Sequence, residues 1–208
     1  MAFPENLKLK SGILQLPQYL PDATFGQVRA LDAVDTESCG IQAVMMNIFH
    51  LMQRPGASTV KSLSGLQSFS GWKKAIFTDS GGFQAWSLIR QNSKFGSLNE
   101  NGIAFTPEGS RRKFLLTPEK CVQLQVSFGS DVVFCLDDCT HIDEPDEEQR
   151  LSVQRTIRWA QRCRAAFDRL VQEKRIPADR QPKLFAIVQG GRSQNLRREC
   201  AEALLEMG

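Results

Sequence analysis

Carboxylate and amide side chains recur in the sequence directly after short apolar runs. Each run is too short for a helix and does not alternate with polar residues, which is typical of a strand buried on both faces. Barrel and open α/β enzymes build their sites at the carboxyl ends of such parallel strands. The pattern of an apolar run followed by a polar side chain occurs four times, which is hard to attribute to turn chemistry alone. The runs and their polar followers are Ile41–Met46 with Asn47 and His50, Ala75–Thr78 with Asp79, Val132–Leu136 with Asp137 and Asp138, and Leu184–Val188 with Gln189.

The segment Asp79–Gln84 reads Asp-Ser-Gly-Gly-Phe-Gln and permits two interpretations. It could be a strand-to-helix turn, with a capping side chain and conformationally permissive glycines. Alternatively, Asp79 is a carboxylate at the floor of a pocket, and the two glycines let a ligand approach the backbone. Phe83 would then offer a flat face on which a ring could stack.

The pair Asp137-Asp138 is equally open. One acid could cap the next helix while the other is solvated. Alternatively, a carboxylate accepts two hydrogen bonds side by side, which matches adjacent N–H groups on a guanine-like ring. Gln189, which both donates and accepts, could read a purine carbonyl or ring nitrogen. Asp79 and Asp137, coming from separate strands, would allow a division of acid and base roles.

Other reactive residue types carry weaker signals. Cys135 and Cys139 with His141 give a Cys-x3-Cys spacing with no second ligand pair, so we expect no metal there, with Cys135 in the sheet and Cys139 lining the pocket. His50 is expected to be structural or at the pocket edge. Arg111–Lys113 could be a solvated turn or a phosphate contact. The six cysteines are expected to be buried free thiols rather than a disulfide scaffold.

The elements that must position these residues follow from periodicity and capping. Thr117-Pro118-Glu119 predicts a helix start, and Gly129 its end. A long helix is predicted over 145–175, acidic first and basic last, and a final helix over 194–207. The segment Gly102–Leu116 predicts a β-hairpin around Pro107-Glu108-Gly109. Strands alternating with helices predict a parallel α/β sheet in a single domain, residues 1–208.

Composition narrows the class of protein. The 208 residues are 41% hydrophobic and 24% charged, which excludes disorder and fibrous repeats. Lys plus Arg number 26 and Asp plus Glu 23, and the resulting charge of +3 permits a nucleic-acid partner without requiring one. No apolar run approaches the roughly 20 residues of a membrane span, and Met1–Lys8 has no apolar signal core, so a soluble cytoplasmic protein is expected.

Taken together, the motifs resemble the tRNA-guanine transglycosylase (queuine/archaeosine tRNA-ribosyltransferase) family. They occur in family order across about residues 40–195, and the Asp-Ser-Gly-Gly-Phe-Gln and Val-Gln-Gly-Gly elements are specific in combination. The matching stretches are Asn47–Leu51 with Arg54–Gly56, Thr78–Gln84 with Ser87-Leu88, Leu115–Glu119, Asp137–Cys139, Thr156–Trp159 and Ile187–Gly191.

The resemblance implies a TIM (β/α)8-type barrel that exchanges guanine for a 7-deazaguanine base at the wobble position of tRNA. It implies that Asp79 is the catalytic acid/base, and that Phe83 stacks on the base. Asp137 and Gln189 would bind the edges of the base. The full set of implied substrate-binding residues is Asn47, Asp79, Ser80, Phe83, Asp137, Cys139, Gln189 and Gly190.

The family's aspartate nucleophile and its structural zinc site lie, by the same resemblance, beyond Gly208. We therefore expect an incomplete barrel of about five strands with an inserted hairpin, no cofactor in this chain, and a complementary C-terminal half or an oligomeric partner. The alternative function is a non-catalytic base-binding or accessory subunit. An unrelated barrel enzyme with paired carboxylates stays open, as do DNA as the polymer and the identity of the incoming base (queuine, preQ1 or preQ0).

Overall fold

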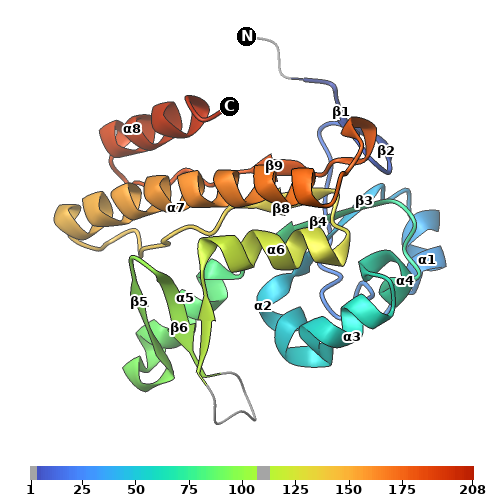
Figure 1. Ribbon diagram of the computed structural model, residues 1–208, viewed down its shortest axis with the longest axis horizontal. Coiled ribbons are helices and arrows are strands. Elements are labelled where there is room, and N and C mark those ends of the chain that lie inside the picture. Colours follow the sequence, from blue (N-terminus) through green and yellow to red (C-terminus); the bar gives the residue numbers. More distant parts are fainter. Residues whose placement is uncertain (1–3, 107–112) are drawn as a thin grey trace. The chain divides into compact units, whose positions relative to one another are not determined.

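The computed structural model describes residues 4–106 and 113–208. The predicted Pro107-Glu108-Gly109 turn and the basic residues Arg111 and Arg112 lie outside these residues. Figure 1 shows the helices and strands with their labels, and by its internal contacts the chain divides into two compact units. Unit 1 comprises Met1–Asp79, Leu124–Val133 and Leu170–Leu184, and unit 2 comprises Ser80–Gln123, Phe134–Arg169 and Phe185–Gly208.

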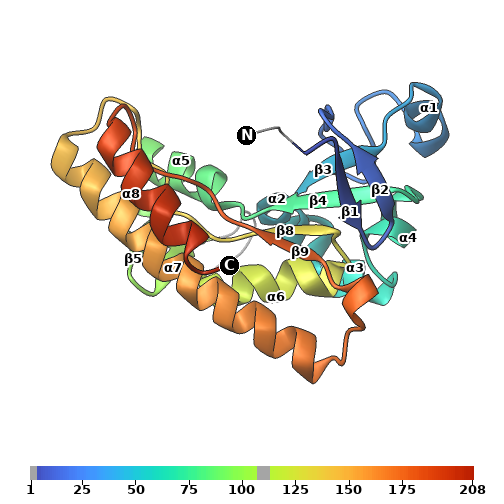
Figure 2. The same cartoon turned by 90° about the horizontal axis from the view of Figure 1, so that it is seen from above.

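A four-stranded sheet, ordered β3-β4-β8-β9, forms the centre of unit 1 (Figure 2). The pairs β3–β4 and β4–β8 are parallel, which confirms the predicted α/β class with a parallel sheet. The last residues of β8 and β9, Phe134 and Phe185, are assigned to unit 2. The strands are β3 (Ala43–Asn47), β4 (Ala75–Asp79), β8 (Val132–Phe134) and β9 (Lys183–Phe185).

Strand bounds differ from the apolar runs in an informative way. Asn47 and Asp79 are the final residues of β3 and β4 rather than the residues that follow. The strand predicted at Leu184–Val188 is present, but its extent and burial were wrong, because β9 ends at Phe185 and its residues are exposed or half-buried. β9 stands at the end of the sheet order, so an apolar run there does not imply burial on both faces.

Short elements surround this sheet in unit 1. The antiparallel hairpin β1–β2 precedes helix α1, whose Asp32 and Asp35 form a reciprocal capping box. Helices α2, α3 and α4 connect β3 to β4. Their bounds are β1 (Asn6–Leu9), β2 (Gly12–Gln15), α1 (Ala33–Ser38), α2 (Ile48–Leu51), a π-helical turn (Met52–Gly56), α3 (Ala57–Ser62), α4 (Leu66–Ser70) and a 3-10 turn (Ala178–Arg180).

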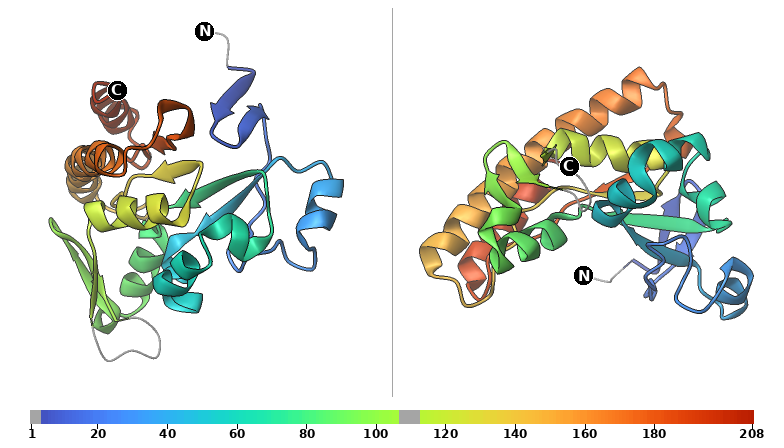
Figure 3. Two further views of the ribbon diagram at one scale, coloured as in Figure 1. Left: turned by 45° about the vertical axis from the view of Figure 1, so that its right-hand side comes forward. Right: turned by 90° about the horizontal axis from the view of Figure 1, so that it is seen from below.

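Unit 2 contains a three-stranded antiparallel sheet where the sequence predicted a hairpin (Figure 3). The predicted pair is present as β6 (Gly102–Phe105) and β7 (Phe114–Leu116). A third strand, β5 (Gly96–Asn99), pairs with β6 and was not predicted, because its Gly-Ser-Leu-Asn sequence is short and polar. Helix α5 (Gly82–Gln91) and a 3-10 turn (Ser93–Phe95) precede this sheet.

Three longer helices match the predicted ones closely. The Thr117 hydroxyl accepts a hydrogen bond from the Lys120 N–H at 3.1 Å, as a helix cap does, and Gly129 adopts φ +81° after the helix end. In unit 2, α8 lies along α7, and Val153, Leu196 and Cys200 are buried between them (Figure 2). The bounds are α6 (Pro118–Phe128), α7 (Asp146–Glu173) and α8 (Gln194–Leu205).

In the described ranges 4–106 and 113–208, no helix combines the length and apolarity needed to cross a membrane. Of the thiols that were expected to be buried, Cys39 is exposed and Cys139 is half-buried, so the prediction was wrong for these two. The others, Cys121, Cys135, Cys163 and Cys200, are buried.

Candidate functional site

Asn47 and Asp79 come together in unit 1 because β3 and β4 are parallel and pair these residues in register. The Asn47 side-chain Nδ2 donates to the Asp79 Oδ2 at 2.8 Å. Asn47 also caps α2, since its Oδ1 accepts from the His50 backbone N–H at 3.1 Å. The buried Asn47 side chain therefore orients the Asp79 carboxylate at the end of β4, and Asn47 is itself the last residue of β3.

Thr24 supports this pair and was missed by the sequence analysis. Its hydroxyl accepts from the Asn47 backbone N–H at 3.0 Å and donates to the Asp22 Oδ1 at 2.5 Å. Asp22-Ala23-Thr24 is recognisable in sequence as a local turn. Its partner lies 23 residues further along the chain, so no local signal could have identified the contact.

Asp137 is the centre of a second polar group, in unit 2. Its Oδ1 accepts from the Ser80 hydroxyl at 3.2 Å, and its Oδ2 accepts from the Gln189 Nε2 at 2.7 Å. The Ser80 Oγ in turn accepts from the Gly82 N–H at 3.1 Å. Asp137 is only 5% exposed. The structure thus brings two predicted site residues, Ser80 and Gln189, to the buried carboxylate of a third, Asp137.

Gly82 fits closely against this group. A Cβ at this position would lie 3.0 Å from the Asp137 carbonyl oxygen and 3.3 Å from the Ser80 hydroxyl. The preceding Gly81 adopts φ +72°, a left-handed conformation that favours glycine. The two glycines of the Asp-Ser-Gly-Gly motif therefore have different roles. Gly81 permits the turn, and Gly82 permits close packing on the Asp137 backbone.

The electrostatics of this group are set by burial. Burial raises the pKa of the Asp137 carboxyl from 3.8 to about 6, with the neighbouring Asp138 charge adding to the shift and the Gln189 and Ser80 hydrogen bonds opposing it. Burial, together with the two aspartates, raises the pKa of the Cys139 thiol to about 11. Near neutral pH, Asp137 is therefore an ionised acceptor, and Cys139 stays a protonated thiol rather than a nucleophile.

The raised pKa of Asp137 predicts a stability penalty that grows with pH. Since the folded pKa exceeds the unfolded one, stability is lost as pH rises from 3.8 to about 6. The full penalty above that window is about 3 kcal/mol. Asp137→Asn should therefore raise the free energy of unfolding at about pH 8 and give no gain near about pH 3.5, in urea titrations at both pH values. An equal effect at both would contradict the assignment.

Asp138 is held by α7 and is not the solvated acid that one interpretation of the pair required. It is 4% exposed, and its carboxylate forms an ion pair with Arg155. Its backbone N–H donates to the Thr156 hydroxyl at 3.0 Å. That interpretation is therefore wrong, because both acids are buried. The two carboxylates differ in their partners: Asp137 accepts from neutral donors, and Asp138 is paired with a cation.

The remaining predicted residues have distinct environments. Phe83 is 55% exposed on the first turn of α5, with its ring centroid 5.7 Å from that of Trp86. Gly190 is buried at φ +133°, where a Cβ would lie 2.6 Å from the Arg197 backbone nitrogen, so it permits close packing against α8. His50 is exposed.

Cys135 is buried, Cys139 is half-buried and His141 is exposed. In the part of the chain that the structure describes, no three His, Cys, Asp or Glu side chains converge as metal ligands would.

Comparisons with known proteins agree with these motifs. A family model described as queuine tRNA-ribosyltransferase matches residues 5–208. Proteins named queuine tRNA-ribosyltransferase from Polaromonas sp. (strain JS666) and Zymomonas mobilis are 39% and 36% identical to the chain. The matches cover 97% and 98% of the chain, and 49% and 50% of the relatives. The chain thus spans about half the length of the curated relatives it matches.

Proposed function

The chain belongs to the queuine tRNA-ribosyltransferase family, and on that premise we propose that it is the N-terminal, base-binding part of an enzyme that exchanges guanine in tRNA for a 7-deazaguanine base. The observation that carries the proposal is the buried Asp137 carboxylate with its two neutral donors, Ser80 and Gln189. An ionised carboxylate that is fixed in this way is suited to a ligand edge with adjacent N–H donors. Guanine has such an edge.

In this proposal the two carboxylates have different tasks. Asp137 and Gln189 bind the edge of the base, Ser80 orients Asp137, and Cys139 and Gly190 line the base site. Phe83, which is exposed at the start of α5, supplies a ring on which the base stacks. Asp79, oriented by Asn47, gives a proton to the guanine that leaves and takes one from the base that enters.

The displacement itself requires a nucleophile at the ribose C1′, and no residue of this chain is assigned to that role. We propose that the strands of this chain form about the first five of a (β/α)8-type barrel within one domain, and that a complementary C-terminal half or an oligomeric partner completes it. The end position of β9 in the sheet order supports this, because an edge strand presents backbone groups with which a further strand could pair. The chain itself is proposed to hold no cofactor. Because the proposed polymer is tRNA, the reaction is assigned to the cytoplasm.

Removal of the Asp137 charge tests the proposal directly. Asp137→Asn keeps the shape of the side chain but replaces one acceptor oxygen by a donor. We expect it to weaken guanine binding by about 1–3 kcal/mol, the usual cost of a lost charge-assisted hydrogen bond. Calorimetric titration of the purified chain, sized in solution beforehand, measures this.

The matched control is Asp168→Asn, which neutralises an aspartate on α7 that pairs with Arg164 at the surface. It should leave guanine affinity unchanged. If Asp137→Asn binds guanine as tightly as this control, Asp137 does not belong to the base site.

A further inference from the structure

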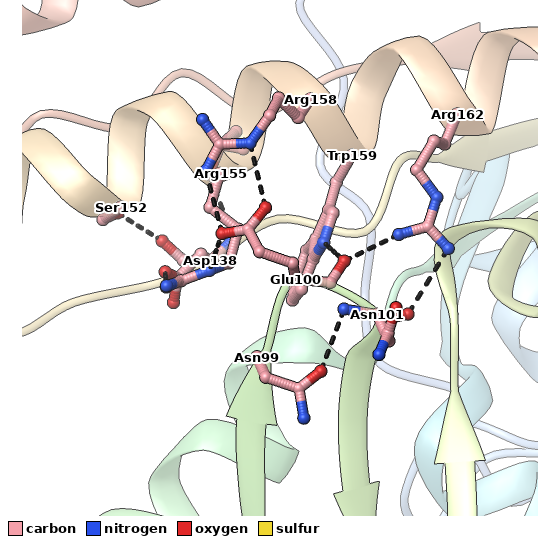
Figure 4. Close-up of polar contacts among 10 residues, drawn as sticks. Asn99, Glu100, Asn101, Asp138, Ser152, Arg155, Arg158, Trp159 and Arg162 are labelled. Carbon is pink, nitrogen blue, oxygen red and sulfur yellow. Dashed lines mark hydrogen bonds and ion pairs between the residues drawn. The ribbon is translucent and has the colours of Figure 1, made fainter.

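Three residues on one face of α7 contact Asp138, and Figure 4 labels two of them, Ser152 and Arg155. Ser152 donates through its hydroxyl to the Asp138 carbonyl oxygen at 2.5 Å. Arg155 donates through Nη1 to the Asp138 Oδ2, and Thr156 accepts from the Asp138 N–H. Residues spaced three and four apart share one helix face, so α7 holds both the backbone and the carboxylate of the residue next to Asp137.

Arg155 is itself held by the β5–β6 turn. Its Nε donates to the Glu100 Oε1 at 3.0 Å, so one guanidinium bridges an exposed and a buried carboxylate. Arg158 binds the same Glu100 carboxylate through two hydrogen bonds, at 2.9 and 2.8 Å. The bidentate contact fixes the plane of the Glu100 carboxylate, which in turn restricts Arg155.

The backbone of this turn is attached to the helix as well. The Glu100 carbonyl oxygen accepts from the Trp159 indole N–H at 2.9 Å and from the Arg162 Nη1 at 2.7 Å. Arg162 also binds Glu119 on α6 through two hydrogen bonds, at 2.6 and 2.8 Å. Thus Arg155 emerges from a helix face that is bound to the turn, as Figure 4 shows, and to Glu119 of α6. This degree of restraint exceeds what an isolated surface ion pair has.

We propose that Arg155 is a positioning residue for base binding: held by Glu100, it neutralises the buried Asp138 and so fixes the place and charge of the adjacent Asp137. This inference rests on the proposed function, since it assigns how the base-binding carboxylate is supported. The buried carboxylate that Arg155 binds is that of Asp138, and its effect on Asp137 travels through that residue. A cation that pairs with Asp138 leaves Asp137 as the anionic acceptor for the ligand.

The charges around both carboxyls determine the sign of the test. Burial raises the pKa of Asp138, and Arg155 opposes that shift more than any other neighbour. Removal of the cation should raise the pH at which the coupled pair becomes fully ionised, whereas removal of the Asp138 charge should lower the pH at which Asp137 ionises. The titratable groups that face the pair are Cys139 and Cys200 beside Asp137, and Arg155, Glu100 and Glu148 beside Asp138.

The test follows the ¹³C carboxyl resonance of Asp137 against pH and the affinity for guanine in the same 208-residue chain. Arg155→Met should weaken guanine binding by about tenfold and raise the ionisation pH of the pair. Asp138→Asn should shift the ionisation of Asp137 to lower pH. The matched control is Arg164→Met, the same substitution on the same helix at a surface pair with Asp168, and it should change neither quantity.

If the ionisation pH rises in Arg155→Met and falls in Asp138→Asn, the positioning role is supported. A general loosening of the structure would not shift the ionisation in opposite directions according to the charge removed. Identical Asp137 titrations in Arg155→Met and Arg164→Met would overturn it. If Arg155→Met does not fold, the double variant with Asp138→Asn removes the cation and the carboxylate it pairs with. Because the effect of Arg155 travels through Asp138, an Asp137 titration that matches Asp138→Asn alone supports the role, and one that differs from it overturns the role. Should the wild type itself not bind guanine, the proposed function fails, while the titrations still decide the role of Arg155.

Discussion

Asp79→Asn is expected to reduce the rate of base exchange by about 10²–10⁴-fold while guanine affinity stays within about threefold. The Asn47 Nδ2, which donates to the Asp79 Oδ2 at 2.8 Å, can still donate to the carbonyl oxygen of the substituted side chain. The orientation of the side chain and the end of β4 are therefore retained. What is lost is the ability to give a proton to the base that leaves and to take one from the base that enters.

The assay is incorporation of labelled guanine into tRNA. The chain is combined for it with a second polypeptide that covers the rest of the length of its relatives. Asp143→Asn is the matched control, since Asp143 is an exposed aspartate in an ion pair with Arg192 and is not in the base site. The control should exchange guanine at the wild-type rate. An Asp79→Asn protein that exchanges guanine as fast as the control would remove Asp79 from the proton-transfer role.

Asp131→Ala is expected to lower the free energy of unfolding by about 3 kcal/mol. Asp131 is fully buried, and its carboxylate accepts from the backbone N–H groups of Ile76, at 2.9 Å, and Ser11, at 3.0 Å. It thereby joins the β1–β2 turn to the start of β4. Truncation leaves the buried Ile76 N–H without its acceptor and removes the partner of the Ser11 N–H, and a buried donor left unpaired is the costly way to break a hydrogen bond.

Lys10 adds to that cost. Burial lowers the pKa of the Lys10 ammonium, and the negative charge of Asp131 opposes this shift. Its Nζ donates to the Gly129 carbonyl at 2.7 Å. Urea unfolding of Asp131→Ala beside Asp179→Ala, which changes an exposed acid of the same unit, measures the effect. Equal midpoints for the two variants would show that the Asp131 contacts contribute no net stability.

The sequence predicted the parts of the site that depend on local patterning. Apolar runs located β3 and β4, and parallel pairing then requires their last residues to lie at one edge, as Asn47 and Asp79 do. The capping pattern at Thr117 likewise located the start of α6. These predictions succeeded because strand burial and helix caps are determined by residues close in sequence.

Contacts between distant residues could not be predicted in this way. Glu100 looked like an ordinary turn residue, yet it binds Arg155 across 55 positions of sequence. Gln189 was a candidate, but nothing local indicated that its amide would meet Asp137, 52 positions earlier. A strand was predicted where β9 lies, but its end and its burial were wrong, because an apolar run does not reveal how much of it pairs or what covers it.

The central claim is that Asp137 binds the donor edge of guanine. The most direct measurement is calorimetric titration of the wild type and Asp137→Asn with guanine and with hypoxanthine, which lacks the exocyclic amine. We predict that the wild type prefers guanine by about tenfold or more, and that Asp137→Asn loses most of this preference. A wild-type chain that binds both bases equally, or a preference that survives in Asp137→Asn, would contradict the claim.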